Sequence, residues 1–199
     1  GSGVLIKNNI LKKKNNTAIN LGFSGRLLKI KGVEVLLKSF IEINKYDKKY
    51  KLFLAGTVDE KNPTSLTKKD IEIWSKYKNI KFLGHIKDIQ SFWEKMDIGI
   101  FPSLYGEGIP KSMLEAVAYR CPIITTDVKG CLDFSKNQNN SITVKTGEFN
   151  EIFSAIKFLG EDYHQRTKMA ERALALLKKE YSEDVITNEY LKMYKLTLD

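Results

Sequence analysis

The chain has 199 residues, an apolar share of 42% and a formal net charge of +9, which suits one substantial globular domain. No apolar run approaches the roughly 20 residues that a membrane-spanning helix needs. No signal peptide is recognisable either, so the cytoplasm is the expected compartment.

The positive charge comes almost entirely from lysine, because only Arg26, Arg120, Arg166 and Arg172 are arginines. Asparagine is abundant too, which indicates a compositional bias rather than a surface built to follow phosphates. Nucleic acid is therefore not expected as a partner. A basic surface can still favour an anionic membrane at about 1 kcal/mol per well-placed charge. Peripheral association with the cytoplasmic face of the inner membrane is thus one expectation.

Cysteine and histidine do not indicate a metal centre or a catalytic triad. Cys121 and Cys131 flank a predicted strand and turn without a further Cys or His at ligand spacing, so we expect reduced, structural thiols. His85 and His164 are the only histidines and lie far apart in the sequence. No metal cofactor is predicted.

Residues 1–16 are interpreted as a tag remnant followed by a linker. The opening Gly-Ser-Gly resembles an expression tag, and residues 7–16 are polar and charged without periodicity. Because polar linkers mark domain boundaries, we expect a further domain upstream.

From residue 17 onward, short apolar runs alternate with amphipathic segments. Strands are expected at 17–24, 50–55, 80–83, 98–102, 122–126 and 142–144. Helices are expected at 33–46, 67–77 with Thr67 as its cap, 89–96, after Gly108 and Pro110, and at 151–159, 163–181 and 182–196, with a Gly-containing turn at 127–134. This alternation predicts an α/β fold, a Rossmann-like, doubly wound parallel sheet of about six strands.

The most informative stretch, residues 98–126, reads as strand, loop, helix and strand. Its helix is nearly all apolar except for Glu115, and such a carboxylate must find hydrogen-bond donors or become neutral. The free N–H groups of Ile109, Lys111 and Ser112 at the helix start form an anion site. Glu115 leans back toward that start and can accept hydroxyls beside it. A ligand that carries phosphate and sugar hydroxyls would satisfy both.

Eight positions earlier, Glu107 lies on a Gly-flanked loop at the carboxyl end of a strand, where open α/β sheets bind ligands. The two carboxylates form an E-x7-E pattern, with GIPKSMLEAVA after Glu107 and PIITTDVKGC further on. This pattern resembles the retaining glycosyltransferases of the GT-B fold, family four. The resemblance implies that Glu115 holds a nucleotide ribose and that Glu107 holds the donor sugar near its reactive carbon. A solvated loop residue at Glu107 and a lysine-paired helix carboxylate at Glu115 are the alternatives.

The turn at residues 22–32, GFSGRLLKIKG, is the second place where chemistry is visible. Gly25 allows close backbone approach, and Arg26 and Lys31 stand on either side of the turn. In a lysine-rich chain, the arginine suggests that a planar, two-pronged guanidinium is needed, and a pyrophosphate is the obvious partner. The family has the same G-R-L…K-G signature, which implies that Arg26 and Lys31 hold the donor diphosphate. A surface ion pair at Arg26 is the alternative.

The segment KFLGHIKDI resembles the family's F-x-G segment, which implies that His85 and Ile86 meet the nucleotide base largely through backbone atoms. An exposed loop histidine is the alternative. Gly25, Gly108, Ile109, Pro110 and Lys111 complete the predicted donor site. Where relatives often have Arg-Glu after TTDVKGC, this chain has Leu132 and Asp133, so no role is assigned to that pair.

The resemblance covers residues 20–196 and implies the C-terminal, donor-binding half of a GT-B enzyme. Residues 17–181 would form the donor domain, and residues 182–199 a helix that braces an N-terminal, acceptor-binding domain. The implied reaction moves a hexosyl or N-acetylhexosaminyl group from a nucleoside diphosphate sugar, expected to be a UDP-sugar, to a glycan or lipid-linked glycan with retention. Surface polysaccharide or glycoconjugate synthesis is the expected context.

Arg26, Lys31 and Glu107 are the expected catalytic residues, and no cofactor is expected. Metal-dependent glycosyltransferases use an Asp-x-Asp pair, which this sequence does not contain. Every predicted site residue points to the donor, so these residues alone are expected to transfer no sugar.

Two other classes of function stay open. A dinucleotide-dependent oxidoreductase would share the fold, but the G-x-G-x-x-G fingerprint does not follow the first strand. A non-catalytic nucleotide-sugar-binding module would also share it, since fold alone does not define activity.

Overall fold

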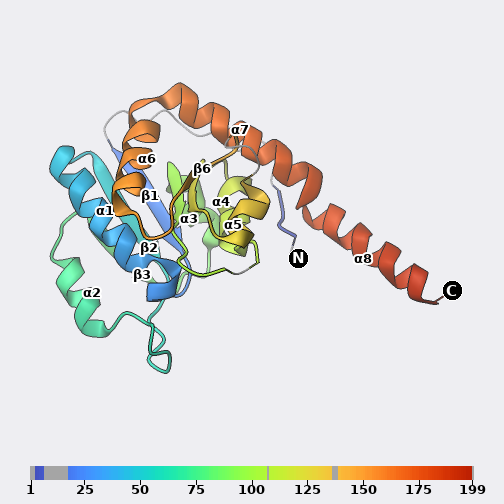
Figure 1. The fold of residues 1–199 in the computed structure, drawn as a ribbon, viewed down its shortest axis with the longest axis horizontal. Helices are drawn as coiled ribbons and strands as arrows, with labels where there is room; N and C mark the ends of the chain where they lie inside the picture. Colours follow the sequence, from blue (N-terminus) through green and yellow to red (C-terminus); the bar gives the residue numbers. More distant parts are fainter. Residues whose placement is uncertain (1–2, 7–17, 107, 136–138, 199) are drawn as a thin grey trace.

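The computed structural model describes residues 3–6, 18–106, 108–135 and 139–198. Within them, six strands form one parallel sheet in the order β3-β2-β1-β4-β5-β6 (Figure 1). The strands are β1 (Ile19–Ser24), β2 (Tyr50–Ala55), β3 (Ile80–Gly84), β4 (Ile98–Phe101), β5 (Ile123–Thr126) and β6 (Ile142–Val144). The helices are α1 (Val33–Tyr46), α2 (Lys68–Ser75), α3 (Ile89–Lys95), α4 (Lys111–Ala118), α5 (Lys129–Phe134), α6 (Phe149–Glu161), α7 (Tyr163–Glu180) and α8 (Glu183–Leu198), with a short 3-10 turn, η1 (Lys29–Lys31).

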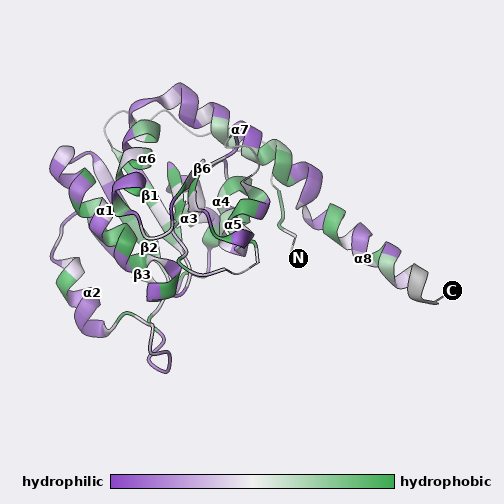
Figure 2. Ribbon diagram, in the orientation of Figure 1, coloured by the Kyte–Doolittle hydropathy of each residue, from purple (hydrophilic) through white to green (hydrophobic). Residues whose placement is uncertain are grey.

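Helices cover both faces of this sheet, as a doubly wound fold requires. One buried cluster joins the strands to α1 and α6, and a second joins them to α3, α4 and α7. Neighbouring residues of β5 divide between the clusters, with Ile124 in the first and Ile123 in the second. Because successive strand side chains point to opposite faces, the two clusters lie on opposite sides of the sheet. Figure 2 shows mostly hydrophobic colouring along α4 and a hydrophobic stretch in the C-terminal half of α7, and both helices contribute residues to the second cluster.

The predicted fold class and parallel sheet are confirmed, and most elements begin and end within two residues of the expected positions. Thr67 caps α2 as expected: its hydroxyl accepts from the Asp70 N–H at 3.1 Å, and the Asp70 carboxylate accepts from the Thr67 N–H at 2.8 Å. Such a reciprocal capping box satisfies two backbone donors that the helix itself cannot. The cap therefore explains why a largely exposed helix starts here.

One element was predicted wrongly. Residues 127–134 were expected to form a Gly-containing turn, but Lys129–Phe134 form the helix α5. Gly130 lowers intrinsic helix propensity, which made the turn the better local prediction. Cys131 and Phe134, three positions apart, are both fully buried. Their burial on one helix face outweighs the local preference.

Residues 3–6 lie against the junction of α7 and α8. The Val4 N–H donates to the Tyr181 carbonyl at 3.2 Å, and the Val4 carbonyl accepts from the Glu183 N–H at 3.1 Å. Val4 is buried in the cluster that contains α4 and α7. The linker interpretation of residues 7–16 falls outside the described residues. Beyond the junction, α8 extends away from the body of the domain, and Tyr190, Met193 and Tyr194 on it are exposed (Figure 1).

The turn between β1 and α1 is held against the loop after β4. Gly32 has a φ of 74°, in the left-handed region, and a β-carbon placed there would lie 1.8 Å from the Pro102 carbonyl oxygen. Nearby, the Leu104 N–H donates to the Ile30 carbonyl at 2.8 Å. Only glycine permits this approach, so residue 32 fixes the turn beside the end of β4.

Substitution of Gly32 by alanine should destabilise the domain by about 3 kcal/mol or more, because left-handed backbone strain and displacement of Pro102 add together. The matched control is Gly147→Ala: Gly147 has a φ of 83°, but nothing lies within 4 Å of its added β-carbon. This control should lose only roughly 1–2 kcal/mol. Urea unfolding measures both, and equal losses would contradict the Pro102 contact.

Candidate functional site

The direction of chain winding reverses between β1 and β4. β2 follows β1 on one side of the sheet, whereas β4 pairs with β1 on the other, in a register that aligns Leu21 with Ile98 and Gly22 with Gly99. At such a switch point, the loops after the two strands leave in opposite directions and open a crevice at their carboxyl ends.

A cavity of about 260 Å³ occupies this crevice. Its lining comes from the end of β1 and the following turn, from the end of β4, and from the start of α4: Phe23, Ser24, Gly25, Arg26, Lys31, Phe101, Ser103, Pro110, Lys111 and Ser112. The structure therefore brings five residues of the predicted donor site into one cavity: Gly25, Arg26, Lys31, Pro110 and Lys111. Here it is called the switch-point cavity.

Ser24 and Ser103 also line the switch-point cavity, and sequence reasoning missed them. Ser24 ends β1, and Ser103 stands two residues after β4. The rule that parallel strands present ligand groups at their carboxyl ends could have found both. Each side chain offers a hydroxyl that can donate to an anion.

The switch-point cavity is built for negative charge. Three cationic side chains, Arg26, Lys31 and Lys111, line it, and its lining contains no carboxylate. The first hydrogen bonds within α4 run from the Met113 and Leu114 N–H groups to the Pro110 carbonyl, at 3.0 and 3.3 Å. The N–H groups of Lys111 and Ser112 come before the first of these intrahelical bonds. They therefore lie at the helix N-terminus, where helices bind phosphate.

Arg26 also forms the ion pair that was considered as an alternative. Its Nη1 lies 3.6 Å from Asp59 Oδ2, and the Arg26 side chain is 61% exposed. Exposed pairs at such distances contribute about 0–1 kcal/mol, since water screens them. The pair can therefore orient the guanidinium while leaving it available to a doubly charged ligand.

Glu115 lies one helical turn after Lys111 and is half-buried. Burial raises the pKa of its carboxyl group, and the positive charge of Lys111 partly offsets this rise. Burial also raises the pKa of Tyr119, and the negative charges of Glu94, Asp88 and Glu115 raise it further. The charge of Lys111 acts on Glu115, which agrees in part with the alternative of a lysine-paired carboxylate. The contact of Glu115 with a ribose stays a prediction.

The predicted base-binding segment follows β3 at the same carboxyl edge of the sheet. His85 is exposed, whereas Ile86 is half-buried against the cluster that contains α4. The Gly56 N–H donates to the Gly84 carbonyl at 2.8 Å, which ties this loop to the end of β2. Neither His85 nor Ile86 lines the switch-point cavity, so the structure places them on the same edge but outside it.

Two further predicted residues are not brought into the switch-point cavity. Gly108 is exposed, and the side chain of Ile109 lines a different cavity of about 480 Å³, beside Tyr181 and Ile186 at the α7–α8 junction. Glu107 lies outside the described residues, so its predicted contact with the donor sugar stays a prediction. Leu132 and Asp133 are exposed on α5.

The described residues contain no group of three or more His, Cys, Asp or Glu side chains that could hold a metal ion. The thiols of Cys121 and Cys131 are buried and not joined in a disulfide, as predicted. The Cys121 thiol lies 3.3 Å from the Met96 carbonyl and 3.4 Å from the Trp93 carbonyl, so its role is structural. Across the described ranges, none of the helices has the length and apolar character needed to cross a membrane.

A doubly wound parallel sheet with a crevice at its switch point defines the Rossmann-like class of domains. Residues 18–162 match the family profile described as "Glycosyl transferases group 1", and the chain belongs to this family. The family prediction from the sequence is confirmed at this level.

Two curated relatives illustrate the similarity. The chain is 28% identical over 197 residues to the capsular polysaccharide biosynthesis glycosyltransferase CapM of Staphylococcus aureus, covering 97% of this chain and 51% of CapM. It is 34% identical over 115 residues to a Campylobacter jejuni N,N'-diacetylbacillosaminyl-diphospho-undecaprenol alpha-1,3-N-acetylgalactosaminyltransferase, covering 58% and 30% of the two chains. The chain thus spans about half the length of CapM and less of the second relative.

Solved glycosyltransferase structures share the fold. HepE of Anabaena in complex with UDP and glucose aligns with a TM-score of 0.78 at 18% identity, covering 90% of this chain and 48% of HepE. The C-terminal domain of the group 1 protein LpcC from Francisella tularensis aligns with a TM-score of 0.70 at 24% identity, covering 82% and 86%. These likenesses establish the GT-B type of Rossmann-like domain.

Replacement of Glu115 by glutamine should raise the melting temperature of the unliganded domain at pH 7–8. Burial raises the folded-state pKa of Glu115, so the wild type loses stability as pH rises through that pKa, whereas glutamine has no charge to desolvate. The gap between variant and wild type should close below about pH 4, where the carboxyl is protonated in both folded and unfolded states.

Thermal melts at several pH values test this expectation. The control is Glu72→Gln on the exposed surface of α2, which should change the melting temperature little at any pH. A Glu115→Gln gap that is constant between pH 4 and pH 8 would contradict the desolvation of Glu115.

Proposed function

We propose that this chain is the donor-binding half of a retaining glycosyltransferase. It would bind a nucleoside diphosphate sugar, a UDP-sugar in the first instance, and provide a hexosyl or N-acetylhexosaminyl group for a glycan or lipid-linked glycan acceptor. The observation that carries the proposal is the switch-point cavity, where Arg26, Lys31 and Lys111 meet the start of α4. Its charge and its size suit a diphosphate.

The chemistry of this cavity follows from the leaving group. When the glycosidic bond to a diphosphate breaks, negative charge grows on the phosphate oxygens. Arg26 can donate two parallel hydrogen bonds to them, and Lys31 and Lys111 add point charges. Preorganised donors of this kind act most strongly on charge that develops in the transition state. In this proposal the protein lowers the barrier chiefly by electrostatic stabilisation of the departing diphosphate.

The other parts of the donor are assigned by position. Glu115 would accept hydroxyls of the ribose beside the start of α4, and ligand donors would favour its charged form against the effect of burial. His85 and Ile86 would meet the base through backbone atoms. Glu107 would orient the donor sugar rather than attack it.

The relatives support the substrate class. HepE has been solved with UDP-glucose, and TarM of S. aureus with UDP and alpha-GlcNAc-glycerol. CapM is a capsular polysaccharide enzyme, and the C. jejuni relative takes an undecaprenol-linked acceptor by name. By analogy, this chain would serve surface polysaccharide or glycoconjugate synthesis at the cytoplasmic face of the inner membrane.

The acceptor hydroxyl would come from a second, N-terminal domain. A transferase must bring that hydroxyl within about 3–3.5 Å of the donor carbon. The cavity lining described above fits a diphosphate, and CapM is about twice as long as the matched region. Residues 182–199 would brace that second domain, and residues 17–181 would hold the donor.

Substitution of Arg26 by alanine should weaken UDP binding by about 1.5–3 kcal/mol, the usual range for hydrogen bonds to a charged group. Isothermal titration calorimetry provides the measurement. The matched control is Arg172→Ala, which removes an exposed arginine on α7 that does not line the switch-point cavity. The control should bind UDP like the wild type. Unchanged affinity in the Arg26 variant would overturn the phosphate role.

UDP binding should not require a divalent metal, because three side-chain cations and a helix N-terminus already surround the switch-point cavity. Calorimetric titrations with 1–5 mM magnesium, with manganese and with EDTA should agree within about twofold. A loss of UDP affinity in EDTA that magnesium restores would contradict metal independence.

A further inference from the structure

The strand β5 ends in Thr125 and Thr126, whose hydroxyls donate to β4 and to the loop after it. The Thr125 hydroxyl donates to the Phe101 carbonyl at 3.1 Å, and the Thr126 hydroxyl donates to the Ser103 carbonyl at 2.6 Å. Both threonines are fully buried, and neither lines the switch-point cavity. Each hydroxyl therefore acts on the backbone that leads to the cavity and does not contact a ligand there.

The two hydroxyls bind different kinds of backbone. Phe101 is the last residue of β4 and lies opposite Thr125 in the register of β4 and β5, so strand pairing already holds it. Ser103 stands two residues beyond β4, where this pairing has ended. The Thr126 hydroxyl thus continues the connection between the two segments past the end of the sheet. Its distance of 2.6 Å to the Ser103 carbonyl is short for an O–H···O bond, which indicates a well-formed interaction.

The peptide unit between Ser103 and Leu104 is hydrogen-bonded on both sides. Its carbonyl accepts from Thr126, and its N–H donates to the Ile30 carbonyl at 2.8 Å. Ile30 lies in η1, and the next residue, Lys31, lines the switch-point cavity together with Ser103. Because a hydrogen bond at the carbonyl polarises the peptide, it strengthens the bond that the same peptide donates. Thr126 thereby acts through one peptide on the turn that carries Lys31.

The end of β5 is itself held from its other side. The Asp127 N–H donates to the Val144 carbonyl at 3.1 Å, and the Asp127 carboxylate accepts from the Thr146 N–H at 2.9 Å. The Thr146 hydroxyl donates to the same carboxylate. The backbone next to Thr126 is therefore tied to β6 and to the turn after it, so the Thr126 hydroxyl extends from a fixed position.

We propose that Thr126 is a positioning residue for the switch-point cavity. Its hydroxyl fixes the Ser103–Leu104 peptide, and this peptide holds the β1–α1 turn in the arrangement that a diphosphate needs. This role rests on the donor-binding function proposed above and adds a residue that contacts no ligand. Without the hydroxyl, the turn and the loop after β4 would have to become ordered when the ligand binds, and that cost lowers affinity.

Thr126→Val should weaken UDP binding about fivefold or more, the equivalent of one lost hydrogen bond, and Thr126→Ser should restore most of the affinity. Isothermal titration calorimetry provides the measurement. The matched control is Thr125→Val, which removes the adjacent buried hydroxyl and a bond to a residue that strand pairing still holds. This control should lose a similar amount of stability in urea but bind UDP like the wild type.

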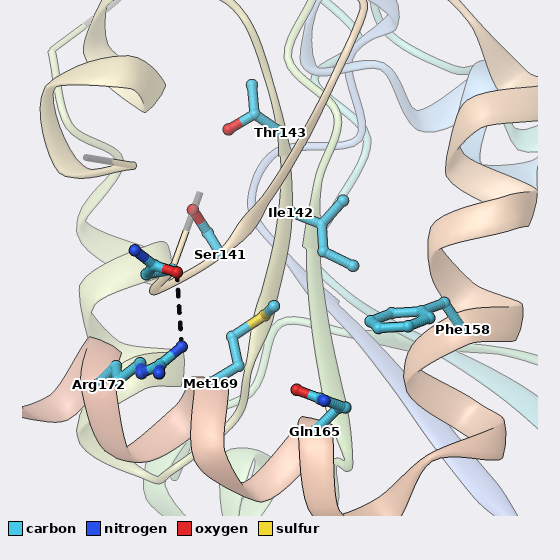
Figure 3. Close-up of a pocket in the computed structure, with 8 residues that line it drawn as sticks. Ser141, Ile142, Thr143, Phe158, Gln165, Met169 and Arg172 are labelled. Atoms are coloured by element: carbon cyan, nitrogen blue, oxygen red, sulfur yellow. Dashed lines mark hydrogen bonds between the residues drawn. The ribbon is translucent and has the colours of Figure 1, made fainter. Parts of the chain in front are cut away.

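Thr143 on β6 supplies a second control, because it lies opposite Thr125 in the register of β5 and β6. Figure 3 shows Thr143 beside a separate hollow of about 250 Å³, which shares no lining residue with the switch-point cavity. The buried hydroxyl of Thr143 has no hydrogen-bond partner within the described residues. Thr143→Val should therefore lose neither stability nor UDP affinity.

The Leu104 amide provides a readout that needs no ligand. Its hydrogen exchange, followed by ¹⁵N NMR, should be about fivefold faster in Thr126→Val than in Thr125→Val, because only the first variant weakens the Leu104 N–H bond to Ile30. Wild-type UDP affinity in Thr126→Val, no recovery in Thr126→Ser, or equal Leu104 exchange in the two valine variants overturns the inference. A wild-type chain that binds no UDP refutes the proposed donor site instead, and Leu104 exchange then decides whether Thr126 holds the peptide.

Discussion

The parallel pairing of β1 with β4 is the constraint on which the candidate site depends. It places the ends of β1 and β4 next to each other, although the segments that follow these two strands lie far apart in the sequence. The close approach of Gly32 to the Pro102 carbonyl then fixes the β1–α1 turn against the loop after β4. Arg26 and Lys31 on that turn thereby meet the start of α4 across one cavity. Side-chain charges and helix N–H groups converge because the β1–α1 turn and the loop after β4 are held together through their backbones.

Burial near this site has opposite consequences for stability and for binding. Glu115 raises the energy of the unliganded domain when it is charged, since its apolar helix removes water from the carboxylate. The same burial strengthens any hydrogen bond that a ligand donates to it. Exposed groups such as Arg26 behave differently, because their pairing with Asp59 contributes little and is readily exchanged. The site therefore combines one partly desolvated acceptor with cationic side chains, which suits a ligand that carries both hydroxyls and phosphates.

The switch-point cavity collects three cations and a helix start from segments that the sheet brings together. This arrangement suits a multiply charged ligand with little apolar surface.

The sequence by itself determined most of the elements and most of the residue types that line the switch-point cavity. Apolar periodicity, the Thr67 cap and the glycines between elements are local signals, so α1, β2 and β6 were predicted residue for residue. Arg26 and Lys111 could likewise be singled out from their positions beside a turn and a helix start. The resemblance of these motifs to the glycosyltransferase family depends only on the order of residues along the chain.

Only the tertiary structure decided the strand order, the helix α5 and the exact membership of each cavity. Strand order depends on pairing between distant segments, which no local pattern encodes. Burial of Cys131 and Phe134 outweighed a glycine to form α5. Ser24 and Ser103 joined the switch-point cavity, whereas the side chain of Ile109 turned toward α7 and α8. In each case the deciding free energy came from contacts between segments that are distant in the sequence.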